Sequence, residues 1–411
     1  MLIINIGCLV NVADVKQPLA GKELANLPLI RDAFLLIEYG RIACLGNMFE
    51  LELLVPQLPN HVVDAKGAFI LPAWVDSHTH IVFAGSREAE FVDKIKGLNY
   101  ADIAAKGGGI LNSAARLAEK TEDELFNAAM RRIEEVAHLG TGAIEIKSGY
   151  GLSLESELKM LRVITRIRNE APLLVKRTFL GAHAYPLVFK DNHQAYLNLL
   201  INEMLPAIAK EKLADYVDVF CENGFFSVQE MEQVCNAAAK HGLKPKLHIN
   251  QLNSIGGLQS AIKLNAVSVD HLETMTENDI ANLSASHTIG TLLPTAAYFL
   301  RMMYQPARKM IDAGCKIALA SDYNPGSSPS GNMNTVVSMS CIQMKMLPEE
   351  AINAATIQGA FAMEEANEVG SIAVGKRANL IMLTPVPSIA YIPYAFGTNL
   401  IDRVILNGRF I

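Results

Sequence analysis

The chain has 411 residues, of which 50% are hydrophobic and 19% are charged, and its formal net charge is −6. This length exceeds the size at which one hydrophobic core keeps growing, so we expect one large domain and a smaller one. The acidic balance argues against nucleic acid or an anionic membrane as a partner, and no apolar stretch reaches the roughly 18 residues of a membrane span.

The N-terminus and the cysteines are typical of a cytoplasmic protein. The opening residues Met1–Asn5 have neither the basic region nor the small-residue cleavage site of a secretory signal. The six cysteines stand singly, without a Cys-x-x-Cys spacing. This pattern indicates reduced thiols and not a disulfide framework.

Both ends of the chain are rich in predicted strands. The strand predicted over 33–38 leads through Tyr39-Gly40 into a second strand, which is the pattern of a hairpin. Near the other end, a predicted strand leads into Asn407-Gly408, a strong two-residue hairpin signal. We therefore predict that residues 1–66 and 367–411 form one composite β-sandwich domain.

The middle of the chain, residues 67–366, alternates short apolar runs with amphipathic helical stretches such as Glu122–His138 and Leu154–Arg168. The predicted strands cover residues 69–75, 142–146, 175–180, 216–221, 245–249, 267–270, 288–293 and 316–320. Eight β-then-α units are the number found in a (β/α)8 TIM-like barrel. The predicted fold class is therefore α/β, a barrel with a small β-sandwich domain formed from both chain ends. A doubly wound sheet is the alternative.

The first barrel strand ends in Asp76-Ser77-His78-Thr79-His80. Because strand side chains alternate between faces, Asp76, His78 and His80 share one face. At the carboxyl end of a barrel strand that face points into the mouth, where active sites of this fold lie. Two imidazoles are good ligands for Zn²⁺ or Fe²⁺. A chance His-x-His on a surface loop is the alternative, and the apolar run over 69–75 argues against it.

Three later strand ends also carry chemistry, at His248, His271 and Asp322. Strand ends of a barrel converge, so we expect a mononuclear site with His78, His80 and His248 as nitrogen ligands. Asp322 is the expected oxygen ligand, and one position is left for water. A bound metal lowers the pKa of that water towards ~7. Asp322 would take its proton, and His271 would polarise the attacked carbonyl or shuttle a proton. A structural role is the alternative for His271.

Several segments match a known family. They are His78–Arg87, Glu145–Gly151, Phe179–His183 and Ser321–Pro329, together with Gly370–Ala378, which is typical of amidohydrolases. Over nearly its whole length the chain resembles the imidazolonepropionases. The resemblance implies one zinc or iron ion per subunit. It also implies hydrolysis of the lactam C–N bond of 4-imidazolone-5-propanoate to N-formimidoyl-L-glutamate in L-histidine degradation. The triplet Gly107–Gly109 resembles a family segment too and predicts a turn or a lid hinge.

The resemblance also implies a set of substrate-binding residues. They are Arg87, Tyr150, His183, Gln251, Asn324, Gly326 and Ser327. Arg87 is the natural clamp for the propanoate, because a guanidinium meets a carboxylate through two parallel hydrogen bonds. A surface ion pair with Glu88 or Glu90 is the alternative for this arginine. Tyr150 stands between two glycines, so we expect it on an exposed, flexible loop.

One position departs from the family pattern. After the third histidine the family commonly has alanine, an acidic residue, and then Glu or Gln, whereas this chain has Ile249-Asn250-Gln251. Gln251 can hydrogen-bond to substrate or water but cannot take a proton. Asp322 and His271 therefore remain the candidates for acid–base catalysis.

Two other functions stay open from the sequence. Another mononuclear amidohydrolase, such as a nucleobase aminohydrolase, would use the same ligands. A non-catalytic barrel would be expected to lack some of the four ligands, and all four are present. The segment Val219–Glu222 has no lysine to bridge two metals, which disfavours dinuclear relatives. The expected partner is a small anionic substrate. The sequence leaves open whether the protein forms a homodimer.

Overall fold

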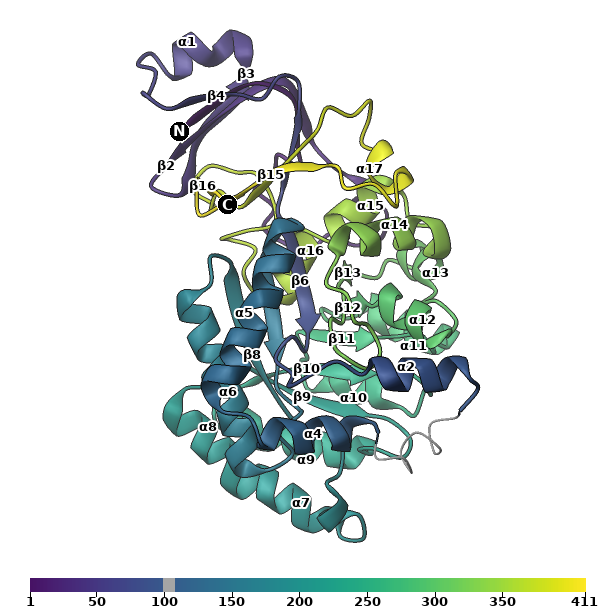
Figure 1. Cartoon of the computed structure of the whole chain (residues 1–411). Coiled ribbons are helices and arrows are strands. Elements are labelled where there is room, and N and C mark those ends of the chain that lie inside the picture. The colour runs from purple at the N-terminus through teal and green to yellow at the C-terminus, as the bar shows by residue number, and fades with distance from the viewer. Residues whose placement is uncertain (99–107) are drawn as a thin grey trace.

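The computed structural model describes residues 1–98 and 108–411 (Figure 1). These residues form a parallel barrel and a separate sheet built from both ends of the chain. Of the glycine triplet, Gly107 lies outside the described residues, and Gly109 has φ 87° directly before a helix. No helix within the described ranges combines the length and apolar composition that a bilayer crossing needs.

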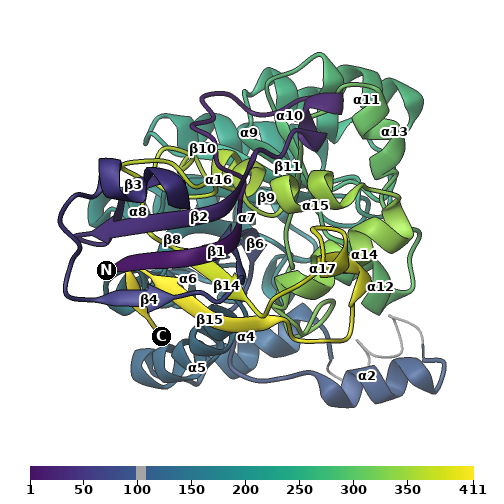
Figure 2. The ribbon, with the colours of Figure 1, turned by 90° about the horizontal axis from the view of Figure 1, so that it is seen from above.

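The sheet made by the chain ends runs in the order β16-β15-β14-β5-β1-β2-β3, with β4 beside β1. Its strands are β1 (Leu2–Val10), β2 (Leu29–Glu38), β3 (Arg41–Asn47), β4 (Val62–Asp64), β5 (Phe69–Pro72), β14 (Leu380–Leu383), β15 (Ile401–Leu406) and β16 (Arg409–Phe410). Figure 2 shows the purple N-terminal strands beside the yellow C-terminal ones. Both predicted hairpins are confirmed: Tyr39-Gly40 and Asn407-Gly408 all have positive φ, as a type I′ turn requires.

The barrel has eight parallel strands in the order β6 to β13. They are β6 (Trp74–Thr79), β7 (Thr141–Lys147), β8 (Leu174–Ala182), β9 (Tyr216–Cys221), β10 (Lys244–Ile249), β11 (Ser268–His271), β12 (Ile289–Leu292) and β13 (Ile317–Leu319). Hydrogen bonds close the barrel between β6 and the segment after β13. Asp322 N donates to His78 O at 3.0 Å, and His80 N donates to Tyr323 O at 2.9 Å. The predicted fold class is confirmed.

Helices surround the barrel (Figure 1). The α-helices are α1 (Leu51–Leu54), α2 (Glu88–Ile95), α4 (Ile110–Ala118), α5 (Glu122–His138), α6 (Leu154–Glu170), α7 (His193–Leu199), α8 (Leu205–Glu211), α9 (Val228–Ala239), α10 (Gly257–Lys263), α11 (Glu277–Ser284), α12 (Pro294–Leu300), α13 (Ala307–Asp312), α14 (Met333–Met344), α15 (Pro348–Ala354), α16 (Ile357–Ala362) and α17 (Tyr391–Tyr394). Short helical turns are η1 (Gly21–Ala25), η2 (Met48–Glu50), η3 (Leu187–Phe189) and the π-helical η4 (Leu200–Met204). Side-chain caps fix the starts of the two longest helices: Thr121 caps α5 and Ser153 caps α6.

The strand predicted over 69–75 is wrong, because this run forms two strands in different sheets. β5 pairs with β1 and β14, whereas β6 begins the barrel at Trp74. The chain passes from one sheet to the other at Ala73, whose N–H donates to Asn379 O at 2.9 Å. Residues 69–79 are all buried. The pattern of apolar residues therefore gives no sign of the point at which the chain passes from one sheet to the other.

Candidate active site

Three side chains meet where the barrel closes. His78 and His80 come from the end of β6, and Asp322 comes from the segment after β13. The two Nε2 atoms are 3.3 Å apart, and Asp322 Oδ1 lies 3.5 Å from Nε2 of His78 and 3.6 Å from Nε2 of His80. A tetrahedral centre with bonds of about 2.1 Å separates its donor atoms by about 3.4 Å. The triangle therefore fits one divalent metal ion.

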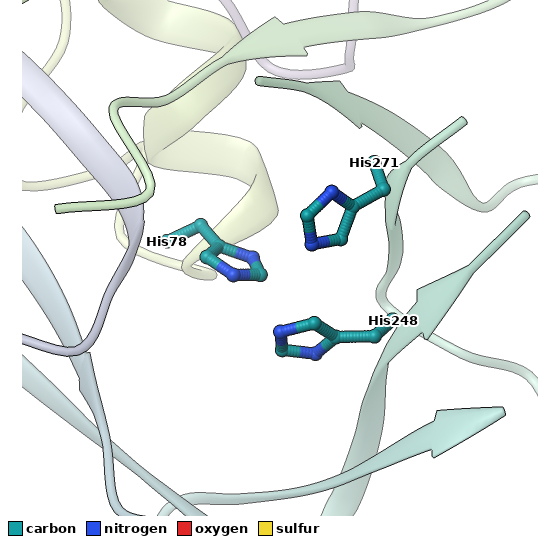
Figure 3. Close-up of side chains that lie close together, drawn as sticks. All are labelled: His78, His248 and His271. Atoms are coloured by element: carbon teal, nitrogen blue, oxygen red, sulfur yellow. The ribbon is translucent and has the colours of Figure 1, made fainter. Parts of the chain in front are cut away.

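Two further histidines face the same centre. Figure 3 shows the rings of His78, His248 and His271 turned towards a common point. Their ring centroids are 4.6 to 5.6 Å apart, and one nitrogen of each lies within 4.8 Å of the others. All three are at most 3% exposed. The structure thus brings together the four predicted ligands and the predicted proton shuttle.

Two buried aspartates fix the tautomers of the histidines. Nδ1 of His78 lies 2.7 Å from Asp270 Oδ2, and Nδ1 of His248 lies 2.7 Å from Asp218 Oδ2. An ionised carboxylate only accepts hydrogen bonds, so both Nδ1 atoms carry the proton and both Nε2 atoms keep a lone pair. Burial, together with the neighbouring cations and imidazoles, holds the pKa of His78, His80 and His248 well below its usual value. Neutral imidazole is the form that binds a metal.

The pKa values of Asp322 and His271 are both raised. Burial raises the pKa of Asp322 to about 6, although the nearby His271 opposes this shift. For His271, burial alone would lower the pKa, but Glu273 and Asp322 raise it above its ordinary value. Nδ1 of His271 lies 3.4 Å from Glu273 Oε1, which also accepts a 2.9 Å hydrogen bond from Gln305 Nε2. Burial thus favours the neutral carboxyl of Asp322, whereas the nearby carboxylates favour the protonated imidazole of His271.

Asp76 lies on the same strand face as the histidines, but its carboxylate makes hydrogen bonds that hold the backbone in place. Its two carboxylate oxygens accept hydrogen bonds from the backbone N–H of Ser321 at 3.0 Å and from the Ser321 hydroxyl at 2.5 Å. Burial raises the pKa of Asp76 to about 7. Asp76 therefore ties β6 to the segment that carries Asp322.

The loop after β13 is held by one asparagine side chain. Oδ1 of Asn324 accepts hydrogen bonds from the N–H groups of Gly326 and Ser327, both at 2.8 Å. Ser327 Oγ in turn donates to Asp322 Oδ2 at 3.3 Å. At Gly326 a Cβ atom would lie 2.2 Å from Nη1 of Arg87. Glycine therefore makes the space that the guanidinium fills.

Arg87 pairs with Glu90, one of the two partners expected for a surface ion pair, but this pair is largely buried. Arg87 precedes α2, and its Nε and Nη2 donate to Glu90 Oε2 at 2.9 and 2.5 Å. Glu90 is itself largely buried and also accepts the Gly109 N–H at 2.9 Å. Nη1 has no hydrogen-bond acceptor among the described residues, and Arg87 lines the cavity described below. The ion pair with Glu90 thus orients the guanidinium towards the cavity.

The expectation of an exposed, flexible Tyr150 is wrong, because this side chain is only 3% exposed. The carboxylate of Glu157 in α6 accepts hydrogen bonds from the N–H groups of Gly149, Gly151 and Leu152 at 2.7 to 3.2 Å. The Gly149 carbonyl accepts the Nδ1 proton of His183 at 3.0 Å, so Nε2 of His183 keeps a lone pair. Burial raises the pKa of Tyr150 and keeps its phenol neutral.

One cavity of about 580 Å³ joins these groups. Its lining includes His80, Arg87, Tyr150, His183, His248, Gln251, His271, Asp322, Asn324, Gly326 and Ser327. His78 lies beneath it, fully buried. Phe91, Phe220, Phe225 and Phe299 supply apolar walls. A small ligand with an anionic end could therefore contact both Arg87 and the candidate metal ligands within this cavity.

Sequence reasoning missed the residues that hold the histidines. Asp218, Asp270 and Lys147 stand in buried strands, and none of them is among the site residues expected from the sequence. The available signal was a charged side chain inside an apolar strand, since such residues are rarely buried unless they are paired.

The sequence of this chain is similar to known proteins along its whole length. Residues 69–411 match the amidohydrolase family. An imidazolonepropionase of Flavobacterium johnsoniae is 54% identical, with 100% of this chain and 99% of the relative covered. An imidazolonepropionase of Flavobacterium psychrophilum is 53% identical, with the same coverage. A solved structure of E. coli guanine deaminase superposes with a TM-score of 0.73 at 15% identity, covering 100% of this chain and 98% of the deaminase. That last likeness concerns the fold alone.

Proposed function

This chain belongs to the amidohydrolase family and, within it, to the imidazolonepropionases. We propose which of its residues bind the substrate and which carry out the hydrolysis of the lactam C–N bond. The substrate is 4-imidazolone-5-propanoate, and the product is N-formimidoyl-L-glutamate, an intermediate of L-histidine degradation. Water adds to the ring carbonyl carbon, the bond from that carbon to the ring nitrogen breaks, and the nitrogen takes up a proton. The reaction needs an activated water, a proton carrier and a site for the carboxylate.

The observation that carries this proposal is the shared cavity. Arg87, Gly326 and Ser327 line the same cavity as His80, His248 and Asp322. These residues come from separate parts of the chain and were each expected at the site. A chance arrangement would not be expected to line one cavity with all of them.

We propose that His78, His80, His248 and Asp322 hold one divalent ion. When bound, such an ion acts as a Lewis acid that lowers the pKa of water to about 7. The proposed ligand set is supported by the donor triangle and by the lone pairs that Asp218 and Asp270 leave on the histidine Nε2 atoms. Nitrogen and carboxylate donors suit both zinc and iron, so the metal is assigned by elemental analysis of protein purified from its own host.

Asp322 and His271 are the proposed proton carriers. The Asp322 carboxylate can accept the proton of the attacking water and release it to the leaving ring nitrogen. His271 stands beside it and can donate a hydrogen bond to the carbonyl oxygen as charge develops there. Gln251 lines the cavity as a hydrogen-bonding group and takes no part in proton transfer.

Arg87 is the proposed anchor of the propanoate. Glu90 occupies one edge of the guanidinium, which leaves Nη1 for the carboxylate. The phenol of Tyr150 can donate a hydrogen bond to the substrate ring, and Nε2 of His183 can accept a hydrogen bond from a ring N–H. Asn324 and Ser327 complete the binding wall by shaping the loop around Gly326. Together these contacts select a small ring with an anionic side chain.

The test is a paired activity assay of the purified chain loaded with zinc or with ferrous iron. We expect it to consume 4-imidazolone-5-propanoate and to leave guanine and cytosine unchanged. A nucleobase aminohydrolase is the alternative, and it predicts the reverse. Turnover of a nucleobase without turnover of the imidazolone would overturn the proposed substrate.

We further propose that the protein works in the cytoplasm on this freely diffusing anion. All six cysteines are free thiols, and four of them are buried, as suits a reducing compartment. Fractionation of the host cell with detection of the native protein tests the location.

A further inference from the structure

We propose that Lys147 is a positioning residue of the metal centre, which holds Asp218 and Asp270 so that they aim His248 and His78. This inference rests on the metal site proposed above. It concerns a lysine that contacts neither the cavity nor the proposed ligands directly. Its effect would pass through the two aspartates.

Lys147 is the last residue of β7 and is fully buried. Its Nζ lies 2.9 Å from Asp218 Oδ2, 3.4 Å from Asp270 Oδ2 and 2.9 Å from Glu145 Oε1. Asp218 belongs to β9 and Asp270 to β11. One ammonium group therefore joins carboxylates from two other barrel strands.

The two oxygens that contact Lys147 are the same two that orient the histidines. Asp218 Oδ2 accepts the Nδ1 proton of His248, and Asp270 Oδ2 accepts that of His78, each at 2.7 Å. Rotation of either carboxylate would turn or release the corresponding imidazole. Lys147 consequently couples the orientation of two proposed ligands that come from different strands.

Electrostatics gives the lysine a specific part in this arrangement. The remaining oxygens are also engaged: Asp218 Oδ1 accepts the backbone N–H of His248 at 3.0 Å, and Asp270 Oδ1 accepts the Ser268 hydroxyl at 2.6 Å. Two carboxylates in a dry interior repel each other, and the ammonium between them offsets that repulsion. Without it the aspartates are expected to move apart, because among the described residues only Lys147 forms an ion pair with both.

Lys246 offers a matched comparison within the same barrel. It is also fully buried, and its Nζ lies 3.1 Å from Glu145 Oε2. It donates hydrogen bonds to Ser268 Oγ and to Ala362 O, both at 2.8 Å. Within the described part of the chain its only ion-pair partner is Glu145. Lys246 therefore shares the burial and the charge of Lys147, but it reaches only Asp270, and it does so through the Ser268 hydroxyl.

The test compares zinc binding by the full chain in wild type, K147M and K246M. Zinc affinity is measured by competition with a chelator, and ligand geometry by the visible spectrum of the cobalt-loaded protein. We expect K147M to lower zinc affinity by about 10- to 100-fold and to alter the cobalt spectrum. K246M should lose clearly less zinc affinity than K147M, because Lys246 reaches only one of the two aspartates and does so through Ser268. Equal losses in the two variants, or wild-type affinity in K147M, would overturn the inference.

A second comparison covers the case in which K147M does not fold. K147M/D218N removes one charge of each sign, so the buried charge balance is kept. Because the contact of Lys147 with Asp270 is also lost, this double variant should bind zinc about threefold to 10-fold more weakly than D218N alone. Equal zinc affinity of the two would refute the positioning role. Failure of the wild type to bind zinc or ferrous iron would instead overturn the proposed metal site itself.

Discussion

At the scale of single residues, the candidate site is built from side chains that orient one another. His78 and His248 keep their Nε2 lone pairs because Asp270 and Asp218 accept their other ring protons. Arg87 is turned towards the cavity because Glu90 holds one edge of its guanidinium. In each case a buried carboxylate determines what a neighbouring group can offer to a ligand. Removing the orienting group and removing the oriented group should therefore have different consequences.

His248→Ala should abolish both metal binding and activity. The substitution removes one of the proposed ligands and leaves Asp218 without its imidazole partner, while the hydrogen bond from the backbone N–H at position 248 can remain. Metal content is measured by elemental analysis after dialysis, and folding by circular dichroism. His241→Ala, at an exposed position, is the control and should retain metal. Stoichiometric metal in the His248 variant would show that the ligand set is different.

Arg87→Ala should raise KM by about 10- to 100-fold while metal content stays unchanged. Hydrogen bonds to a charged group are worth about 1.5 to 3 kcal/mol, and here they are assigned to the propanoate. Glu90→Gln should raise KM less, because it weakens only the contact that orients the guanidinium. Steady-state kinetics with the imidazolone substrate measures both. Unchanged kinetics in the Arg87 variant would remove this residue from the substrate site.

At the scale of elements, the start of α6 fixes the loop that carries Tyr150. Three backbone N–H groups converge on the Glu157 carboxylate, and a Cβ atom at Gly151 would lie 2.4 Å from the Glu157 backbone nitrogen. The loop and the first turn of the helix are thus packed as one unit. Gly149 in the same loop orients His183 through its carbonyl.

Glu157→Gln should therefore raise KM although residue 157 does not line the cavity. An amide has one acceptor oxygen instead of two, so at least one of the three N–H groups loses its partner. We expect the loop to loosen and Tyr150 to become accessible, which fluorescence or hydrogen exchange of the loop can follow. Metal content should not change. Normal KM together with normal protection of the loop would contradict this role for Glu157.

The strand ends of the barrel could be predicted from sequence, but their surroundings could not. Apolar runs that finish in His248, His271 or Asp322 are local patterns, and the alternation of strand side chains brings them to one mouth. The capture of the Tyr150 loop by Glu157 depends on three amides meeting one carboxylate, which no local pattern signals. The same holds for Lys147, whose partners lie on strands far away in the sequence. The split of residues 69–75 was hidden because both resulting strands are buried.

At the scale of the whole molecule, the segment that returns from α16 to β14 connects the barrel with the sheet of the chain ends. Ile372 N donates to Asn11 O at 2.9 Å, and Ser371 Oγ donates to Ala13 O at 2.7 Å. Lys376 is buried in this segment at 3% exposure and donates to Ser371 Oγ at 2.7 Å. Asn379 follows at the start of β14. The returning chain is therefore held by hydrogen bonds to the segment that follows β1.

Lys376 should make stability depend on pH in the alkaline range. Burial lowers its pKa to about 8 from an ordinary 10.5, so between these values the unfolded chain binds a proton that the folded protein does not. The free energy of unfolding therefore gains a contribution as pH rises from about 8 to 10.5, and this contribution is absent below pH 8. Denaturant unfolding gives the free energy of unfolding of wild type and of K376M at each pH, and the difference between the two proteins should change across this range. A constant difference between the two proteins would contradict the shift.

The sheet and the barrel should unfold together, because Asn379 joins them. Its Nδ2 donates to Gly142 O in β7 at 3.0 Å, and its Oδ1 accepts the Asn407 N–H at 2.7 Å. Asn379→Ala leaves both backbone groups without these partners, so we expect a loss of about 2 to 4 kcal/mol in the free energy of unfolding. Asn278→Ala, at an exposed position, is the control and should change it by less than about 0.5 kcal/mol.

The readout can separate the two parts of the molecule. Trp74 is the only tryptophan in the sequence and stands at the start of β6, where its indole donates to Asn334 Oδ1 at 3.1 Å. Its fluorescence follows the barrel, whereas far-ultraviolet circular dichroism follows both the barrel and the sheet. In wild type and in Asn379→Ala the two transitions should coincide, with the variant shifted to lower denaturant concentration. Two separated transitions in the wild type would mean that the sheet and the barrel unfold independently, and that the Asn379 contacts do not couple them.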